Sequence, residues 1–214
     1  MTTGSKQILR ETESGFVSRE TMDRLELYAA LIRKWQPAIN LISQKTLPQL
    51  WDRHIQDSLQ LFRLQPAPLT WMDMGSGAGF PGVVMAICLA EKGAGWVHLV
   101  ESNYKKASFL RQAVAQTGAR ATVHPMRIDA AREKIGKIDA ISARALAPLT
   151  DLLGHSAAFA ADNADIQLWL HKGLDYPDEV RSARDHWTFD LIEHHSLLQD
   201  GSAILQISNF SKRN

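Results

Sequence analysis

The stretch Trp71-Met-Asp-Met-Gly-Ser-Gly-Ala-Gly-Phe-Pro-Gly82 joins two apolar segments through a turn rich in glycine. Residues 69–72 form a mostly apolar, β-prone run that predicts a short buried strand. Residues 83–89 are apolar and follow a proline, which is typical of the first turn of a helix. Gly75 and Gly77 let the backbone turn sharply and approach a ligand closely, because they have no Cβ. The stretch therefore predicts a strand, a ligand-binding turn and a helix whose N-terminus adds free N–H groups.

The spacing of the glycines distinguishes two kinds of cofactor site. A dinucleotide site uses G-x-G-x-x-G, whereas Gly75, Gly77 and Gly79 alternate here. This pattern resembles motif I of the class I S-adenosylmethionine-dependent methyltransferases, whose loop surrounds the amino-acid part of the cofactor. Glu101 follows the next expected strand, 96–100, where a carboxylate can accept hydrogen bonds from both hydroxyls of an unphosphorylated ribose. Glu101 fits S-adenosylmethionine and NAD equally and argues against NADP. Glycines alone could form a plain tight turn, but turn, helix, strand and acid in this order favour a cofactor site.

Composition and charge are those of an ordinary globular protein. The chain has 214 residues, of which 45% are hydrophobic and 22% charged, and its formal net charge is +1. Because the net charge is small, no overall electrostatic attraction draws the chain to nucleic acid or to a membrane. The single cysteine, Cys88, lies in an apolar segment and is best explained as a small core residue. Since no apolar run approaches the roughly 18 residues of a membrane span, we expect a cytoplasmic protein without a membrane segment.

The amino-terminal part of the chain is expected to form a helical cap and not an independent domain. One helix begins near Arg19, carries an apolar stripe at three- and four-residue spacing, and ends before Pro37. A second helix is expected over residues 47–64. We therefore divide the chain into a cap, 1–65, and an S-adenosylmethionine-binding domain, 66–214.

The rest of the chain alternates strands and helices, which is the pattern of a doubly wound parallel sheet. We expect strands at 69–72, 96–100, 121–124, 138–141, 165–170, 189–194 and 203–207, and helices after Pro81 and at 103–117, 148–160 and 178–186. The fold class is Rossmann-like α/β, with a seven-stranded, mainly parallel sheet, helices on both faces and the amino-terminal cap. Ligands of such sheets bind at the carboxyl ends of the strands, and these ends carry Gly75, Glu101, Asp129, Arg144 and Lys172.

Several segments spread along the chain carry a family pattern. They are Gly75-Ser-Gly-Ala-Gly-Phe-Pro-Gly82, Val100-Glu-Ser102, Lys106-Ala-Ser-Phe-Leu-Arg111, Arg127-Ile-Asp129 and Ser142-Ala-Arg-Ala-Leu-Ala147, with Trp35-Gln-Pro-Ala-Ile-Asn-Leu41 and Arg53-His-Ile-Gln-Asp-Ser-Leu59 in the cap. Together they resemble the RsmG (GidB) family, whose members methylate N7 of a guanine in the decoding-centre loop of bacterial 16S ribosomal RNA. The resemblance implies a class I methyltransferase that uses S-adenosylmethionine. It also implies 16S rRNA as the partner, within the small ribosomal subunit or an assembly intermediate.

The glycine loop and the resemblance together assign the cofactor site. The expected contacts are Gly75, Ser76, Gly77, Gly79, Phe80, Glu101, Ile128, Asp129 and Arg144. Asp129 could hold the adenine amino group, or it could instead cap a helix over 130–133. Arg144 is expected to meet the cofactor carboxylate or an RNA phosphate, with a structural salt bridge as the alternative. Gln36 and Ile42 stand where the family more often has asparagine and threonine, and these departures bear on substrate contact.

The loop after the fourth expected strand indicates which atom is methylated. Adenine-N6 enzymes usually place an Asn/Asp-Pro-Pro-aromatic loop there, and pyrimidine-C5 enzymes need a cysteine nucleophile. This chain has Ser142-Ala-Arg-Ala145, and its only cysteine is Cys88. Guanine N7 attacks through a lone pair that carries no proton, so in-line positioning and electrostatics suffice. We expect no general base, and Arg144 and Lys172 are the candidate catalytic residues.

Contact with RNA would depend on local basic groups. The candidates are Arg53, His54, Lys105, Lys106, Arg111 and Lys172, although each taken alone is more often a solvated surface charge. Lys172, at a strand end, is the best candidate to face the substrate, followed by Arg53 and His54 in the cap. His194 and His195 are adjacent in an expected strand and therefore point to opposite faces, so we expect no metal site.

Other functions fit the same cofactor site. A small-molecule methyltransferase would turn over without ribosomal particles, and a ligand-binding protein of ribosome assembly would bind the cofactor without methyl transfer. The glycine spacing disfavours a dehydrogenase. We expect a monomer. The base position, the physical form of the RNA substrate and the ligand of Arg144 do not follow from the sequence.

Overall fold

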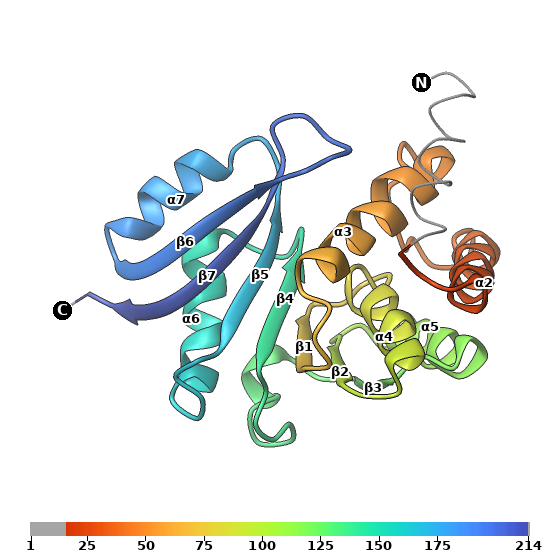
Figure 1. The fold of residues 1–214 in the computed structure, drawn as a ribbon, viewed down its shortest axis with the longest axis horizontal. Helices are drawn as coiled ribbons and strands as arrows, with labels where there is room; N and C mark the ends of the chain where they lie inside the picture. Colours follow the sequence, from red (N-terminus) through yellow and green to blue (C-terminus); the bar gives the residue numbers. More distant parts are fainter. Residues whose placement is uncertain (1–15, 214) are drawn as a thin grey trace.

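The computed structural model describes residues 16–213, so the first fifteen residues of the expected cap lie outside it. The described residues form a seven-stranded sheet in the order β3-β2-β1-β4-β5-β7-β6 (Figure 1). Its strands are β1 (Thr70–Met74), β2 (Trp96–Val100), β3 (Ala121–His124), β4 (Ala140–Arg144), β5 (Gln167–Lys172), β6 (Trp187–His195) and β7 (Ala203–Lys212). The first five strands are parallel, and β7 runs antiparallel to both β5 and β6. The predicted fold class is confirmed.

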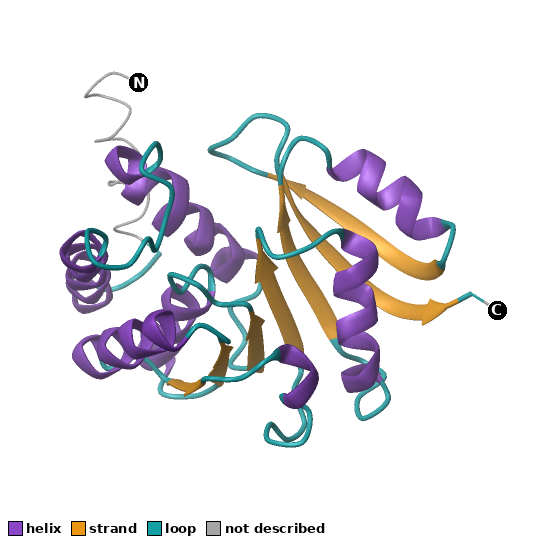
Figure 2. Ribbon diagram, turned by 180° about the vertical axis from the view of Figure 1, so that it is seen from behind, coloured by secondary structure: helices purple, strands orange, loops and turns teal. Residues whose placement is uncertain are grey.

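Helices cover both faces of the sheet, as Figure 2 shows. They are α4 (Gly82–Lys92), α5 (Tyr104–Thr117), α6 (Leu149–Ala160) and α7 (Tyr176–Arg184). Side chains alternate between the two faces of a strand. Trp71 and Leu99 accordingly join the apolar cluster that contains the buried residues of α4 and α5. Met72 and Val100 join a second cluster with α6 and α7. Cys88 is buried in α4, as expected, and burial raises the pKa of its thiol.

The cap consists of α2 (Arg19–Trp35) and a second helical stretch that packs on α4, and α2 itself packs on α4 and α5. The prediction of one continuous helix over 47–64 was wrong. The stretch contains a 3₁₀ turn, a π-helical segment and an α-helix: Leu47–Gln49, Trp51–Gln56 and α3 (Asp57–Leu64). Pro48 brings no N–H to the first turn, and the carbonyl of Arg53 in the π segment accepts a hydrogen bond from Arg144 Nη2 at 2.7 Å. The division between residues 65 and 66 stays a prediction.

Local signals set most element ends. Asn103 caps α5 by accepting from the N–H groups of Lys105 and Lys106, and Gly118 ends that helix at φ +63°. β4 begins at Ala140, two residues later than expected, since Asp139 Oδ2 accepts the Thr70 N–H at 2.8 Å. Helix α7 begins two residues earlier than expected, because a proline is tolerated in the first turn.

Candidate functional site

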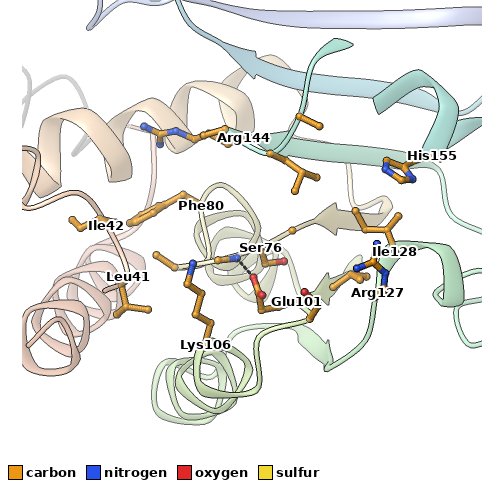
Figure 3. Close-up of a pocket in the computed structure, with 18 of the residues that line it drawn as sticks. Leu41, Ile42, Ser76, Phe80, Glu101, Lys106, Arg127, Ile128, Arg144 and His155 are labelled. Carbon is orange, nitrogen blue, oxygen red and sulfur yellow. Dashed lines mark hydrogen bonds between the residues drawn. The ribbon is translucent and has the colours of Figure 1, made fainter. Parts of the chain in front are cut away.

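A cavity of about 740 Å³ lies at the carboxyl ends of β1 and β4, where the order of the strands reverses. Its size is within the range of small-molecule sites, about 300–1,000 Å³. Four groups of residues line it: the cap (Leu41, Ile42, Ser43, Thr46, His54), the glycine loop (Gly75–Ala78 and Phe80), the β2 end with α5 (Val100–Ser102, Lys106), and the loops after β3 and β4 (Met126–Asp129, Arg144–Ala147) with His155 of α6. Figure 3 shows the cap residues on one side and the β3 loop on the other.

The glycine loop is held open by its backbone conformation and by Glu101. Gly75 and Gly77 have φ values of +63° and +56°, which favour glycine. The N–H of Gly77 donates to Glu101 Oε2 at 2.8 Å, and the N–H of Asn103 donates to Oε1 at 2.7 Å (Figure 3 draws the first of these). A carboxylate has about four acceptor positions, so Glu101 retains acceptors for the hydroxyl groups of a bound ligand. A Cβ at Gly77 would have only Gly75 O within 4 Å, at 3.7 Å, which leaves this backbone open to the cavity.

Asp73 is fully buried beneath the glycine loop, at the end of β1. The pairing of β1 with β4 sets Ser142 opposite it, and Ser142 Oγ donates to Asp73 Oδ1 at 2.7 Å. Burial raises the pKa of Asp73 to about 6, against the lowering effect of this hydrogen bond, and the charge of Glu101 adds to the rise. The Asp73 carboxylate thus links the end of β1 to β4 at the cost of a buried charge.

The raised pKa of Asp73 predicts a measurable pH dependence of stability. The folded protein binds the Asp73 proton more tightly than the unfolded chain does, so this contribution to stability is largest below pH 4 and falls between about pH 4 and 6. Its size is up to about 3 kcal/mol, because each unit of pKa corresponds to about 1.4 kcal/mol. Asp73→Asn lacks this titrating group, so only the wild type should lose stability in this way as the pH rises. We therefore expect the difference in free energy of unfolding, Asp73→Asn minus wild type, to be larger at pH 7.5 than at pH 4 by up to about 3 kcal/mol. Urea unfolding at the two pH values measures it, and an equal difference at both would contradict the assignment.

Phe80 links the glycine loop to the cap. Its ring stacks on His54 at 5.1 Å between centroids and contacts Tyr28 of α2 at 5.5 Å. Tyr28 also donates its hydroxyl hydrogen bond to the carbonyl of Ala78. The guanidinium of Arg144 lies 5.9 Å from the Phe80 ring centroid on the same side of the site. The cap therefore forms part of the wall of the cavity and supports the loop that encloses it.

Arg144 forms the structural salt bridge that was the alternative to a ligand contact. Its Nη1 lies 3.3 Å from Asp57 Oδ2, and its Nη2 donates to the carbonyl of Arg53 at 2.7 Å. The side chains of Arg144 and Asp57 are only 16% and 8% exposed. Burial lowers the pKa of Arg144, and the charge of Asp57 acts in the opposite direction. Arg144 also lines the cavity, so its contact with a cofactor or with RNA stays a prediction.

The structure brings most of the expected cofactor residues to one cavity. Gly79 is the exception: it does not line the cavity, and a Cβ there would lie within 2.6 Å of atoms of Val83 and Tyr28. Asp129 lies within the short 3₁₀ turn Ile128–Ala130, which begins at Arg127 without a side-chain cap. The capping role considered for Asp129 is therefore absent among the described residues, and its Oδ1 instead lies 3.1 Å from the Nδ1 atom of His155.

The six basic residues considered for RNA contact separate into three groups: two line the cavity, two are exposed on α5, and two pair with other side chains of the protein. Lys106 lines the cavity, and Lys105 and Arg111 are exposed on α5. His54 also lines the cavity, but burial and the charges of Arg144 and Arg53 lower its pKa to about 3, so at neutral pH it offers no positive charge.

The remaining two basic candidates are engaged within the protein. Arg53 Nη2 donates to Gln199 Oε1 at 3.0 Å. Lys172 lies in a second cavity, where its side chain is 7% exposed and its Nζ lies 2.6 Å from Glu179 Oε2. Lys172 is therefore neither a solvated surface charge nor a group that lines the cavity at the ends of β1 and β4.

Sequence reasoning missed the contribution of the cap loop to the cavity. Leu41 and Ile42 line it, and Gln36 shapes this loop from a buried position. Gln36 Oε1 accepts from the N–H groups of Leu41 and Ile42, and its Nε2 donates to the Ile42 carbonyl at 2.7 Å. Gln36 therefore acts on the shape of the loop and not by facing the cavity. The signal for this in the sequence was Gln36 itself, which stands where the family more often has asparagine. Met126 and His155 carried no signal in the sequence.

The histidines do not form a metal site in the part of the chain that the structure describes. Among residues 16–213, no three His, Cys, Asp or Glu side chains gather as potential ligands of a metal ion. His194 instead stacks on Trp169 and pairs with Gln206 at 2.9 Å.

Within residues 16–213, no helix combines the length and the apolar character needed to cross a membrane.

Two solved structures with a similar fold carry the description methyltransferase or methylase. A methyltransferase of Podospora anserina with bound S-adenosylhomocysteine matches with a TM-score of 0.59 and 11% identity, over 97% of this chain and 96% of that one. A ribosomal protein L11 methylase of Lactobacillus delbrueckii subsp. bulgaricus matches with a TM-score of 0.54 and 21% identity, over 76% and 79% of the two chains. At these identities the likeness supports the fold alone.

Sequence relatives give a closer match. Ribosomal RNA small subunit methyltransferase G of Sinorhizobium fredii is 54% identical over 198 residues, which are 92% of each chain. The protein of the same name from Rhizobium meliloti is also 54% identical, over 92% of this chain and 93% of that one. The model of the family described as rRNA small subunit methyltransferase G (GidB) matches residues 21–207. Taken with the glycine loop and the carboxylate at the end of β2, these matches show that the chain belongs to the rRNA small subunit methyltransferase G family.

Proposed function

We propose that this protein transfers a methyl group from S-adenosylmethionine to N7 of a guanine in the decoding-centre loop of 16S ribosomal RNA. The observation that carries the proposal is the pair formed by the open Gly77 backbone and the Glu101 carboxylate at the edge of one cavity. Membership of the rRNA small subunit methyltransferase G family supports RNA of the small ribosomal subunit as the substrate.

The residues present fit the cofactor. Glu101 would accept from the ribose hydroxyls, because each of its oxygens takes one backbone hydrogen bond and has a further acceptor position. The glycine loop would surround the amino-acid part, where Gly77 presents backbone that no Cβ covers. Ile128 supplies apolar surface for the adenine ring, and Asp129 supplies a carboxylate for its amino group. The cofactor, when bound, supplies a methyl group on a positively charged sulfur.

The protein's contribution to catalysis is positioning. Guanine N7 carries a lone pair and no proton, so no side chain has to act as a base. Asp73 is buried, Glu101 is engaged by two backbone N–H groups, and His54 is neutral with its Nε2 atom 3.0 Å from Thr46 Oγ1. None of these three is arranged as a general base. Holding two reactants in line can lower a barrier by several kcal/mol, about 7–11 in the best model systems.

Local basic groups supply the attraction to RNA. The net charge of +1 gives no global field, so the binding region has to be a patch. Lys105 and Arg111 are exposed on α5, the helix that also places Lys106 in the cavity. We propose that Lys105 and Lys106, in the first turn of α5 beside the cofactor cavity, contact the phosphate backbone.

A methyl-transfer assay with alternative acceptors tests the function. The purified protein is incubated with labelled S-adenosylmethionine and with small ribosomal subunits that lack native methylation, free 16S RNA, or a mixture of small metabolites. We expect label in 16S RNA, at a higher rate with the small subunit than with free 16S RNA. Label in small molecules alone would instead indicate a small-molecule methyltransferase. Binding of the cofactor without transfer to any acceptor would indicate a non-catalytic assembly protein.

A further inference from the structure

Two elements that are distant in the sequence meet at the part of the cavity assigned above to adenine. His155, on α6, lines the cavity together with Ile128 and Asp129 of the 3₁₀ turn after β3. Figure 3 shows His155 beside Ile128, on the side of the cavity away from the cap residues Leu41 and Ile42. The Nδ1 atom of His155 lies 3.1 Å from Asp129 Oδ1. This contact joins α6 to the turn that is expected to hold the adenine ring.

The Asp129 side chain has little else to hold it. It belongs to a turn of three residues without a side-chain cap, and 66% of it is exposed. Among the described residues, no side chain other than that of His155 pairs with the Asp129 carboxylate. His155 lies on a regular helix beside the buried residues Leu152 and Ser156, and 34% of its side chain is exposed. A group on a packed helix is held more precisely than one on a short turn, so the contact orders Asp129.

We propose that His155 is a positioning residue, which orients the Asp129 carboxylate for the amino group of the adenine of S-adenosylmethionine; this inference rests on the proposed function. A carboxylate only accepts hydrogen bonds, so the imidazole nitrogen that faces it carries the hydrogen. One such contact occupies one of about four acceptor positions of the carboxylate. The others stay available to a ligand, and the amino group of adenine is a donor. His155 acts through Asp129 and needs no contact with the cofactor itself.

This arrangement has two consequences for binding. A carboxylate that is already oriented loses little rotamer freedom when the ligand arrives, so it binds the ligand more tightly than a mobile carboxylate does. The benefit depends on the amino group, because a purine without that group offers no donor to Asp129. The effects of removing the His155 side chain and of removing the amino group are therefore not additive.

Two substitutions of His155 separate positioning from packing. His155→Leu keeps an apolar bulk but loses the donor, whereas the amide nitrogen of His155→Asn can take the place of Nδ1. Calorimetric titration with S-adenosylhomocysteine, the product of methyl transfer, should show an affinity about three- to tenfold lower for His155→Leu, the usual value of one hydrogen bond. His155→Asn should stay within about twofold of the wild type. His195→Leu, at an exposed position that does not line the cavity, is the matched control and should bind as the wild type does.

A ligand without the amino group identifies the contact that His155 serves. The analogue of S-adenosylhomocysteine in which hydrogen replaces this group should bind the wild type about tenfold or more weakly, since a hydrogen bond to a charged group is lost. In His155→Leu and in Asp129→Ala, the same change of ligand should cost less than about threefold. An equal cost in the wild type and in His155→Leu would overturn the proposal, because His155 would then act on another part of the site. The proposed function would fail differently, through absence of methylation of 16S RNA by the wild type.

Discussion

Replacing Gly77 by aspartate is expected to abolish cofactor binding, with a loss of affinity for S-adenosylmethionine of at least about 100-fold. Gly77 has a φ of +56°, and a side chain in this conformation costs about 1–3 kcal/mol. The new side chain enters the cavity, because only Gly75 O lies within 4 Å of a Cβ at this position. Its carboxylate also stands close to Glu101, which the Gly77 N–H contacts at 2.8 Å. A like charge there opposes the geometry that we expect to bind the ribose.

A matched glycine separates the loss of the site from a loss of stability. Gly93, at the end of α4, has a φ of +66° and is exposed, and a Cβ at this position would have no described atom within 4 Å. Gly93→Asp therefore introduces comparable backbone strain away from the cavity, and it should bind the cofactor as the wild type does. Calorimetric titration gives the affinities, and thermal melting gives the stabilities. Cofactor binding by Gly77→Asp within about threefold of the wild type would show that the glycine loop has another role.

Removing the carboxylate of Asp57 is expected to destabilise the protein by about 3–5 kcal/mol, the usual cost of leaving one member of a buried ion pair alone. Asp57, on α3, forms an ion pair with Arg144, at the end of β4. Asp57 Oδ2 lies 3.3 Å from Arg144 Nη1, and both side chains are largely buried. It also lies 3.8 Å from His171 Nε2, at the end of β5. Asp57→Ala should therefore lower the free energy of unfolding in urea and loosen the cap from the sheet.

A double variant shows whether this loss comes from the unpaired charge. Arg144→Met in the Asp57→Ala background replaces the guanidinium by a shorter apolar side chain. We expect the double variant to regain a large part of the lost stability, because no uncompensated charge remains. Equal destabilisation in the single and the double variant would mean that the ion pair does not link α3 to β4. Cofactor affinity in the same variants reports whether Arg144 also acts in the site.

The parts of the fold that follow from local patterns were predictable from the sequence. β2 and β3 have the expected ends, because each is a short run with β-branched residues that follows a helix ended by glycine. Asn103 and Gly118 likewise limit α5 as expected, since capping is local chemistry. The glycine loop and Glu101 were predictable for the same reason: strand, turn and helix are contiguous in the sequence, and the acid follows the next strand.

Contacts between distant segments were not predictable in this way. The pairing of Arg144 with Asp57 depends on how α3 sits against the ends of the strands, which periodicity does not specify. The same holds for Lys172, whose partner Glu179 lies on α7, the next helix of the chain. The neutral state of His54 follows from burial between the cap and the glycine loop. Residue type alone indicated a cation at each position, and the packing decides its partner and its charge.

Nucleoside analysis of methylated 16S RNA is the most direct measurement of the central claim. Small subunits without native methylation are incubated with S-adenosylmethionine and the wild-type protein, and the digested RNA is separated by liquid chromatography with mass spectrometry. We predict one new nucleoside, 7-methylguanosine, located by fragment analysis in the decoding-centre loop and missing from the Gly77→Asp reaction. A methyl group on N1 or N2 of guanine would contradict this claim, because each of those products requires the removal of a proton that this site is not built to accept.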